Sequence, residues 1–514
     1  MYIKKIKLKN FKRYKSLEMT FNTDINIFVG DNESGKSTIL QAIDLVVRGS
    51  VSKVEELGVD KLMNVDAVVQ YMDGEHKCEN LPEFFIELYL SDDLEDITGK
   101  NNSQQVNEHG IRLSCRPNDK FSREIAKTIA VDGSGIPFDF YENVFETFSG
   151  ASYTRRSKFV KSLFVDNSNI GSPYAMNEYV HGLFDVSFDS TKQVELKQKY
   201  RAHKNQFVSD VLKDYQLEQK NYAFSLKNTP RNSIESDLAI SDNGVALENK
   251  GTGIQCFIKT DLALSKSGNV DVIMLEEPEN HLSYTNTVML IEKIKETSKQ
   301  LFVASHSDLI CTRLDLRKCF LMNSSTAQYT SLKTIPEDTA NFFIKAPNNK
   351  MLQFVMTSKA ILVEGDAEYI LIEKMFQIAT GKSLKNAGVG VISVDGLCFK
   401  RYLDIAKIIG MKVVVITDND KDYQAKITDK YAGYLSEKIN VFADTDVNRY
   451  TFEVCLYEDN KALCDNKFTA ERKTLSVQDY MLNNKADVAF VLAQTTEDIV
   501  VPQYIEDALK WINA

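Results

Sequence analysis

A glycine-rich segment at residues 30–37 reads GDNESGKS and fits the pattern GxxxxGK followed by Ser or Thr. In such a segment the glycines allow backbone N–H groups to surround phosphate oxygens at the start of a helix. The lysine, here Lys36, reaches the β- and γ-phosphates, and the hydroxyl of Ser37 binds Mg²⁺. The pattern therefore predicts a site for ATP with Mg²⁺. The candidate residues in and beside the segment are Gly30, Asn32, Gly35, Lys36, Ser37 and Thr38.

Acidic residues and a histidine follow two later apolar runs. The run that begins at Val272 ends in Glu276 and Glu277, and the run at 301–304 leads to His306. In a nucleotide-hydrolysing site, Glu276 helps to hold Mg²⁺ and Glu277 orients and deprotonates the attacking water. His306 is then a candidate sensor of the γ-phosphate. The alternatives are an acidic turn after a strand and a structural histidine.

Three carboxylates further along the chain form a second candidate group. Glu364 follows the apolar run that starts at residue 360, and Asp418 and Asp420 follow the run that starts at residue 413. In a parallel sheet both runs end at one edge, so we expect the three side chains to converge. Oxygen ligands without cysteine or histidine suit Mg²⁺ or Mn²⁺, and such a site can act on a phosphodiester. The alternative is a set of solvated turn residues.

These residues require strands and helices that position them. Alternating apolar and lysine residues at 3–8 predict a half-buried strand, whereas 157–164 and 190–224 are expected to be helical. Beyond about residue 350 strands and helices alternate, which indicates a parallel sheet and an α/β protein. The expected parts are a nucleotide-binding region at 1–150, a helical insert at 151–227, the rest of the nucleotide-binding region at 228–345 and a metal-binding domain at 350–514.

The composition limits the class of protein. The chain has 514 residues with 62 basic and 72 acidic side chains, a formal net charge of −10. These values are ordinary for a globular protein of about three domains, and they exclude a disordered tail protein or a small disulfide scaffold. The eight cysteines contain no CxxC pair, so we expect reduced thiols in a cytoplasmic protein. No apolar stretch reaches the roughly 18 residues of a membrane helix, so no membrane partner is expected.

Residues 1–345 resemble the ABC-type ATPase head of SMC and RecF proteins, through the glycine-rich segment, the paired glutamates and the histidine. In that family a signature segment of one subunit closes on the nucleotide of another. The segment GTGIQ at 251–255 resembles a degenerate signature without the usual leucine–serine start, and Arg13 in NFKR resembles a basic residue near the nucleotide. The resemblance therefore adds to the ATP site Arg13, Gly251, Thr252 and Gly253.

The second domain resembles a Toprim domain, because a glutamate after one strand precedes Asp-x-Asp after a later strand, and Asp395-Gly396 matches the strand between. An ABC head followed by Toprim resembles the OLD (overcoming lysogenisation defect) family of ATP-dependent nucleases. This resemblance implies a dimerising role for the insert, whose alternative is a helical hairpin packed on its own head. It implies the metal ligands Glu364, Glu368, Asp418, Asp420 and Glu453, and the catalytic residues Glu364, Asp418, Asp420, Lys485 and, in the head, Glu277. The alternatives for Glu453 and Lys485 are a surface acid and a solvated lysine.

The OLD resemblance implies a DNA endonuclease or nickase that uses Mg²⁺ or Mn²⁺ and is controlled by ATP. It also implies a homodimer or higher homo-oligomer, and a role in bacterial anti-phage defence with a second protein or a nucleic-acid component. One alternative is a repair ATPase of the RecF or SMC type with a non-cleaving Toprim domain, against which the intact Glu364, Asp418 and Asp420 argue. A topoisomerase or primase is disfavoured, since no nucleophilic tyrosine stands out and the cysteine spacing offers no zinc module.

Overall fold

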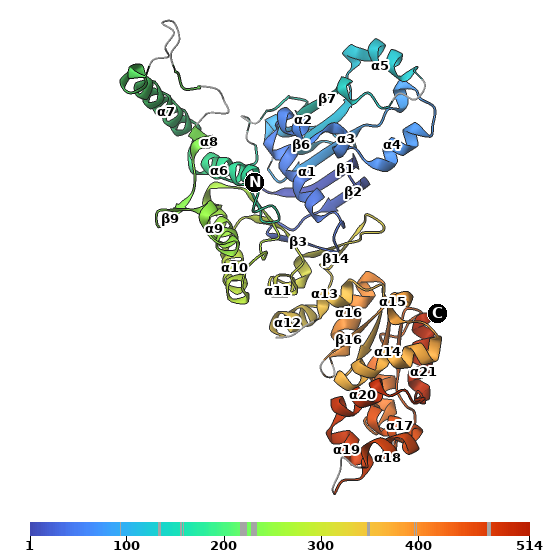
Figure 1. The fold of residues 1–514 in the computed structure, drawn as a ribbon. Helices are drawn as coiled ribbons and strands as arrows, with labels where there is room; N and C mark the ends of the chain where they lie inside the picture. The colour runs from blue at the N-terminus through green and yellow to red at the C-terminus, as the bar shows by residue number, and fades with distance from the viewer. Residues whose placement is uncertain are drawn as a thin grey trace. The chain divides into compact units, whose positions relative to one another are not determined.

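The chain folds into two compact units (Figure 1), namely Met1–His306 with Met322–Tyr329, and Ser307–Leu321 with Thr330–Ala514. The computed structural model describes residues 1–514 except 93, 132–134, 155–156, 158, 216–223, 228–233, 347–349, 395, 397 and 470–473. Asp395, which was matched to the Toprim pattern, therefore lies outside the described residues. No helix in the described part of the chain is both long enough and apolar enough to cross a membrane.

The first unit begins with an antiparallel sheet. In β1 the residues Ile3, Ile6 and Leu8 are buried while the lysines between them are half-buried or exposed, which confirms the predicted half-buried strand. The neighbours follow the order β2-β1-β4-β6-β5, with β7 on the other edge of β6. The strands are β1 (Ile3–Phe11), β2 (Tyr14–Thr20), β4 (Phe84–Leu90), β5 (Thr98–Gly99), β6 (Glu108–Pro117) and β7 (Tyr141–Thr147). Short helices accompany them, namely α2 (Val51–Leu57), α3 (Val59–Leu62), α4 (Val65–Met72) and α5 (Ser122–Ile129).

A parallel sheet carries the candidate nucleotide residues. β12 pairs in parallel with β3 and β11, and β11 pairs in parallel with β8. Because the four strands run in one direction, their carboxyl ends share one edge. The strands are β3 (Ile25–Val29), β8 (Ser162–Asp166), β11 (Val272–Glu276) and β12 (Gln300–Ser305), and the associated helices are α1 (Lys36–Arg48), α9 (Thr252–Ser265) and α10 (Tyr284–Glu296).

The expected helical insert is only partly helical. Residues 162–166 form β8 inside the parallel sheet, so the prediction of a helix at 157–164 is wrong. The run Ser-Leu-Phe-Val-Asp is short and apolar, and periodicity does not distinguish a buried strand from a helix at that length. Helices begin at Pro173, with α6 (Pro173–Ser187), α7 (Ser190–Asp210) and α8 (Ile234–Asp237), followed by the small strands β9 (Ser241–Asp242) and β10 (Val245–Ala246). None of the residues described in α7 is buried.

The second unit contains a four-stranded parallel sheet in the order β16-β15-β17-β18. Its strands are β15 (Lys359–Val363), β16 (Val389–Ser393), β17 (Lys412–Ile416) and β18 (Ile439–Phe442). This confirms the predicted alternation of strands and helices. The helices are α11 (Asp308–Arg313), α12 (Glu337–Lys345), α13 (Met351–Val355), α14 (Asp366–Thr380), α15 (Leu384–Ala387), α16 (Phe399–Ile409), a π-helix (Gln424–Asp429), α17 (Phe452–Asp459), α18 (Lys461–Phe468), α19 (Val477–Asn483), α20 (Lys485–Gln494) and α21 (Gln503–Asn513). The short strands β13 (Cys319–Met322) and β14 (Tyr329–Ser331) precede α12 in the chain but belong to the six-stranded sheet that contains β3, not to this one.

Right-handed crossovers place the helices of this sheet on two faces. The step from β15 to β16 through α14 runs opposite to the steps from β16 to β17 and from β17 to β18, so α14 covers one face and α16 with the π-helix covers the other. The contacts agree, since α14 packs with α20 and α21 whereas α16 packs with α12 and α13. We refer below to the α14 face and the α16 face.

Helix α12 belongs to the second unit although it precedes residue 345, where the sequence analysis ended the ATP-binding region. Phe343 on α12 meets the ring of Tyr402 on α16 edge-on, with 5.3 Å between ring centroids. Thr339 on the same helix donates a hydrogen bond to Asp404 and accepts one of 3.0 Å from Arg401. These contacts join residues about 60 positions apart, so no local pattern in the sequence reports them.

Candidate functional site

The glycine-rich segment forms a phosphate-binding loop between β3 and α1. Gly35 precedes the helix with φ of 100°, which an L side chain rarely adopts, and an added Cβ atom at this position meets the Tyr14 hydroxyl at 2.1 Å. The Lys36 ammonium donates hydrogen bonds to the carbonyl oxygens of Gly30 at 2.8 Å and Asp31 at 3.0 Å. Its position is therefore fixed inside the loop, where phosphate oxygens compete for the same donors.

A cavity at the start of α1 is lined by residues that the sequence analysis assigned to ATP. Its walls include Arg13, Gly35, Lys36, Ser37 and Thr38. The Ser37 side chain is exposed and Thr38 is half-buried, as a ligand-facing helix start requires, and Asn32 is exposed on the loop. The Arg13 guanidinium donates a hydrogen bond of 2.5 Å to the carbonyl of Ser324. That bond fixes Arg13 at the rim of the cavity.

Paired glutamates end β11 beside this loop. Burial raises the pKa of Glu276 to about 7, and a hydrogen bond with the Ser37 side chain opposes the rise. Glu277 adopts φ of 49°, and its Oε1 atom lies 3.3 Å from Nε2 of His306. Burial and the Lys36 charge lower the pKa of His306, so its ring is neutral at neutral pH. The structure thus brings Lys36, Glu276, Glu277 and His306 to one sheet edge.

Glu279 is a site residue that the sequence analysis missed. One of its carboxylate oxygens accepts hydrogen bonds from the Ser305 hydroxyl at 2.6 Å and from the backbone N–H of His306 at 2.9 Å. It therefore ties the end of β12 to the turn after β11 and orients the histidine. The sequence signal was a third acid in the turn EEPE, two residues beyond Glu277.

The residues assigned to the signature lie at the start of α9. Gly251 caps this helix, and an added Cβ atom at Gly253 meets the carbonyl oxygen of His281 at 2.4 Å. Gln255 is buried and its amide donates to the carbonyl oxygens of Glu248 and Lys250. Gly253 and Gln255 therefore have packing roles in this unit, and the assignment of Gly251, Thr252 and Gly253 to a second copy's nucleotide stays a prediction.

A carboxylate group occupies the carboxyl edge of the second sheet. Glu364 follows β15 and Asp418 follows β17, which are paired neighbours. The Glu364 carboxylate accepts hydrogen bonds from the Thr417 hydroxyl and from the backbone N–H of Asp418, the latter at 3.2 Å. Asp418 in turn accepts a bond of 2.8 Å from the backbone N–H of Phe452 at the start of α17. The strand register therefore brings the two predicted carboxylates together.

Glu368, Glu453 and Lys485 join this group from the helices. Burial raises the pKa of Asp418 to about 8, and the charges of Glu364, Glu368 and Glu453 add to the rise. Burial likewise raises the pKa of Glu368 to about 7, with Glu453 and Glu364 adding to it. The Lys485 ammonium lies 3.0 Å from Glu453, whose side chain is 4% exposed. Glu453 is therefore a buried acid rather than a surface acid, whereas Lys485 is exposed to solvent and paired with it.

Asp420 lies apart from this cluster. It is exposed, adopts φ of 47°, and its carboxylate lies 3.3 Å from the Lys426 ammonium. In the part of the chain that the structure describes, no three His, Cys, Asp or Glu side chains are grouped so as to hold a metal ion as they stand. The donor chemistry nevertheless fits Mg²⁺ or Mn²⁺, because the clustered side chains offer carboxylate oxygens whose mutual repulsion a divalent cation relieves.

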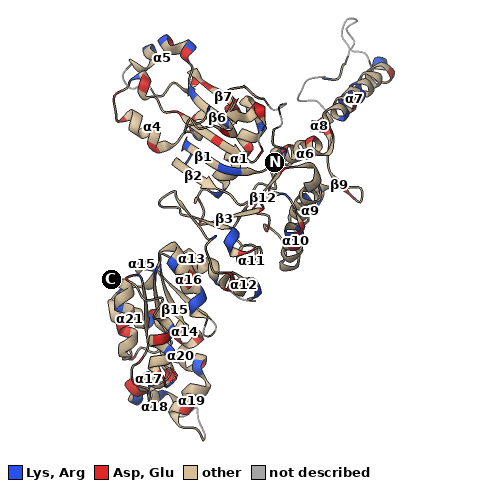
Figure 2. Cartoon of the chain, turned by 180° about the vertical axis from the view of Figure 1, so that it is seen from behind, with Lys and Arg blue, Asp and Glu red and all other residues tan. Residues whose placement is uncertain are grey.

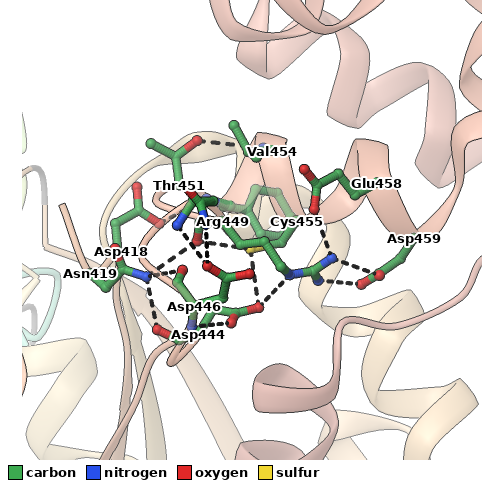
Figure 3. A network of polar contacts seen from close by, with 12 residues as sticks. Asp418, Asn419, Asp444, Asp446, Arg449, Thr451, Val454, Cys455, Glu458 and Asp459 are labelled. Atoms are coloured by element: carbon green, nitrogen blue, oxygen red, sulfur yellow. Dashed lines mark hydrogen bonds and ion pairs between the residues drawn. The ribbon is translucent and has the colours of Figure 1, made fainter. Parts of the chain in front are cut away.

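A polar network holds the loop after β18 against the end of β17 (Figure 3). The buried Asn419 amide donates to the carbonyl oxygens of Asp444 at 2.8 Å, Asp446 at 2.9 Å and Arg449 at 3.3 Å. The Arg449 guanidinium binds Asp459 through two bonds of 2.9 and 2.7 Å and Asp444 through one of 2.7 Å. The network places the start of α17, and with it Glu453, beside Asp418. Asn419 and Arg449 are positioning residues that the sequence analysis missed.

Two family models match the chain. Residues 1–130 match the AAA ATPase domain, and residues 356–420 match the family described as overcoming lysogenization defect protein-like, TOPRIM domain. The chain is thus an α/β protein with an ABC-type ATPase head followed by a Toprim domain. Its Toprim domain is of the OLD type, so the predicted OLD-type combination of ATPase and Toprim is confirmed.

Curated relatives and solved structures are similar over parts of the chain. RecF of Clostridium kluyveri, a DNA replication and repair protein, is 44% identical over 73 residues, which are 14% of this chain and 19% of the relative. RecF of Cytophaga hutchinsonii is 54% identical over 43 residues, 8% of this chain and 11% of the relative. The chain thus matches less than a fifth of either relative's length.

Among solved structures, the C-terminal region of the Burkholderia pseudomallei OLD protein has 21% identity and a TM-score of 0.27, covering 30% of this chain and 96% of that one. The recombination mediator protein RecF with ATP has 13% identity and a TM-score of 0.36, covering 64% of this chain and 97% of that one.

Replacement of Lys36 by alanine is expected to weaken binding of Mg²⁺–ATP at least tenfold, since one hydrogen bond to a charged group contributes about 1.5–3 kcal/mol. Calorimetric titration of the purified protein measures this. Lys120→Ala is the matched control, because Lys120 is exposed on the first unit outside the cavity. Equal affinities of the Lys36 variant and the wild type would contradict the assignment.

Asn419→Ala is expected to destabilise the second unit by about 2–3 kcal/mol, because it removes the buried amide that donates to three carbonyl groups of the loop after β18. Hydrogen exchange of residues 444–451 and denaturant unfolding measure the effect. Asn483→Ala is the control, since Asn483 is exposed and bonds only within its own helix. If the loop kept wild-type protection in Asn419→Ala, the positioning role would be wrong.

Asp418→Asn tests the electrostatics of the carboxylate group. The pKa of Asp418 in the folded protein, about 8, is above its ordinary value of 3.8, so metal-free wild type loses stability as the pH rises toward 8. The neutral variant is spared this loss. In EDTA the melting temperature of the variant should therefore exceed that of wild type by more at pH 8.5 than at pH 5. The corresponding difference in unfolding free energy is a few kcal/mol, because each pKa unit corresponds to about 1.4 kcal/mol. A difference that does not grow with pH would contradict the assignment.

Proposed function

We propose that this protein is a metal-dependent DNA endonuclease or nickase of the OLD type, controlled by ATP at its head. The observation that carries the proposal is the group of Glu364, Glu368, Asp418 and Glu453 at one sheet edge, with Lys485 beside it. Raised carboxylate pKa values in such a group are typical of functional sites. The OLD-like Toprim match over residues 356–420 supports the same reading.

In this proposal the chain's own residues divide the work of phosphodiester hydrolysis. Glu364 and Asp418, with Glu368 and Glu453, would hold Mg²⁺ or Mn²⁺, and Asp420, which is paired with Lys426 in this structure, is assigned to the same ligand set. The bound cation supplies a Lewis acid that activates water and stabilises charge on the phosphate. Lys485, whose ammonium lies 3.0 Å from Glu453, would stabilise charge on the scissile phosphate.

The proposed control by ATP rests on the position of His306 in the chain. His306 is the last residue of the first unit's main segment, and α11 of the second unit begins two residues later at Asp308. Asp308 accepts a hydrogen bond of 2.7 Å from the backbone N–H of Leu352 on α13, a helix that ends at Val355, shortly before β15 begins at Lys359. A change at His306 therefore has a short route toward the strand that precedes Glu364, through the start of α11 and the hydrogen bond between Asp308 and Leu352.

The cellular role and the partners follow from family likeness. We propose that the protein acts on DNA as a homodimer or higher homo-oligomer, with α6 and α7 in the interface, and that it serves in anti-phage defence with a second protein or a nucleic-acid component. The lack of buried residues among those described in α7 favours an intermolecular role over a hairpin packed on its own head.

A second candidate is a RecF-like repair ATPase whose Toprim domain does not cleave. The 44% identity with RecF over 73 residues and the ion pair between Glu453 and Lys485 favour it. The two candidates differ in one property, namely metal-dependent breakage of DNA.

Plasmid cleavage in Mg²⁺ or Mn²⁺ separates them. Wild type should convert supercoiled plasmid to nicked or linear forms, and Asp418→Ala should lower that rate by roughly 100-fold or more, as expected for loss of a metal ligand. Lys36→Ala should keep the basal rate and lose its response to ATP. Asp498→Ala, at an exposed acid of the same unit, is the control. Wild type that leaves the plasmid intact, or Asp418→Ala that cuts at the full rate, would establish the non-cleaving alternative.

A further inference from the structure

The chain turns at Asn419–Asp422, directly after Asp418 at the end of β17, and the backbone of this turn is strained. Asp420 and Lys421 are consecutive residues with φ of 47° and 68°, a region that residues other than glycine rarely occupy. Asn419 closes the turn, since its side chain accepts from the N–H of Lys421 and its carbonyl accepts from the N–H of Asp422. A π-helix follows at Gln424–Asp429. Strained backbone and π-helical turns both concentrate at functional sites.

This turn brings lysines to the carboxylate edge on the α16 face. The ammonium of Lys430, directly after the π-helix, lies near the acids Glu364 and Asp420 and near the lysines Lys426 and Lys400. Burial lowers the pKa of Lys430, and the nearby Glu364 opposes that effect. Lys426 is held by Asp420 at 3.3 Å. Lys400 and Lys430, by contrast, have no carboxylate within ion-pair distance among the described residues.

Aromatic rings orient these ammonium groups. The Lys430 ammonium lies 5.0 Å from the ring centroid of Tyr431, and that of Lys400 lies 6.0 Å from the ring of Tyr434. Tyr434 is itself fixed, because its hydroxyl donates a hydrogen bond of 2.9 Å to Asp404 on α16. Figure 2 shows basic segments next to α16 and acidic segments around α17. Lys400 and Lys430 thus lie beside the carboxylate edge on the α16 face, whereas Lys485 lies on the α14 face.

Such an arrangement suits a polyanion that must approach acids. A phosphodiester strand is repelled by Glu364 and Asp418 unless cations hold its neighbouring phosphates. Lys485 belongs to α20 on the α14 face, whereas Lys400 and Lys430 belong to the α16 face. A strand that crosses the edge from one face to the other therefore meets a lysine on each side of the carboxylates.

We propose that Lys400 and Lys430 form a phosphate-binding ridge that holds the backbone of a DNA strand across the carboxylate edge on the α16 face. This inference rests on the proposed function, since it names residues that position the substrate for that site. The ridge contacts phosphates rather than bases, so it contributes affinity without sequence preference.

The test uses the full-length chain with Asp418→Asn, which keeps the substrate uncut, and a fluorescein-labelled oligonucleotide as single strand and as duplex. Affinity is measured by anisotropy in Mg²⁺ between about 50 and 200 mM salt. Lys400→Ala with Lys430→Ala should weaken binding severalfold and reduce the slope of log K against log salt by about two, one for each lost phosphate contact. Lys400→Arg with Lys430→Arg should retain the wild-type slope because the charges remain.

Lys385→Ala is the matched control. Lys385 is exposed and precedes β16, at the amino edge of the same sheet, and its loss should leave the slope unchanged. If the protein with Asp418 intact cleaves plasmid but the double alanine variant keeps the slope of log K against log salt, the ridge would be overturned and the proposed function would stand. A reduced slope in a chain that never cleaves would support the ridge and overturn the nuclease. A reduced slope in the arginine variant, or an equal loss in Lys385→Ala, would also overturn the ridge.

Discussion

Negative charge confined at the carboxyl ends of two neighbouring parallel strands is the constraint on which the second unit depends. The pairing of β15 with β17 forces Glu364 and Asp418 together, and burial with mutual repulsion raises the pKa of Asp418 to about 8. Without a cation the raised pKa leaves Asp418 protonated at neutral pH, and the two side chains stay together only if the backbone around them is held. Asn419 and Arg449 provide that restraint by fixing the loop that leads into α17. The surrounding structure thus maintains an arrangement that the carboxylates alone would abandon.

In the head, the carboxyl ends of parallel strands also carry acids, but there an ammonium group lies beside them. This edge presents backbone N–H groups and the Lys36 ammonium, which in this structure bonds the carbonyl oxygens of its own loop. A phosphate group must therefore displace intramolecular partners before it gains that lysine. Both units provide positive charge for a phosphate group. The head provides it with the ammonium group of Lys36, and in the second unit a divalent cation bound by the acids would provide it.

Sequence reasoning succeeded where the chemistry needs residues close together in the chain. The loop that holds Lys36 and the strand ends at Glu364 and Asp418 are short motifs whose flanking apolar runs fix the local structure. It failed where partners are distant. Arg449 acquires its role from Asp444 and Asp459 around it, and β8 at 162–166 is a strand because β11 lies beside it. A short apolar run does not encode that neighbour.

The two units are interleaved in sequence. The chain passes from one to the other at His306, returns for Met322–Tyr329, and leaves again at Thr330. The second unit is therefore not a module attached by one linker. No single peptide-bond cleavage detaches it whole from the head, and exchange of the Toprim part between proteins by recombination must carry α11 and α12 with it. We therefore expect the ATPase and Toprim parts of such a chain to be inherited together.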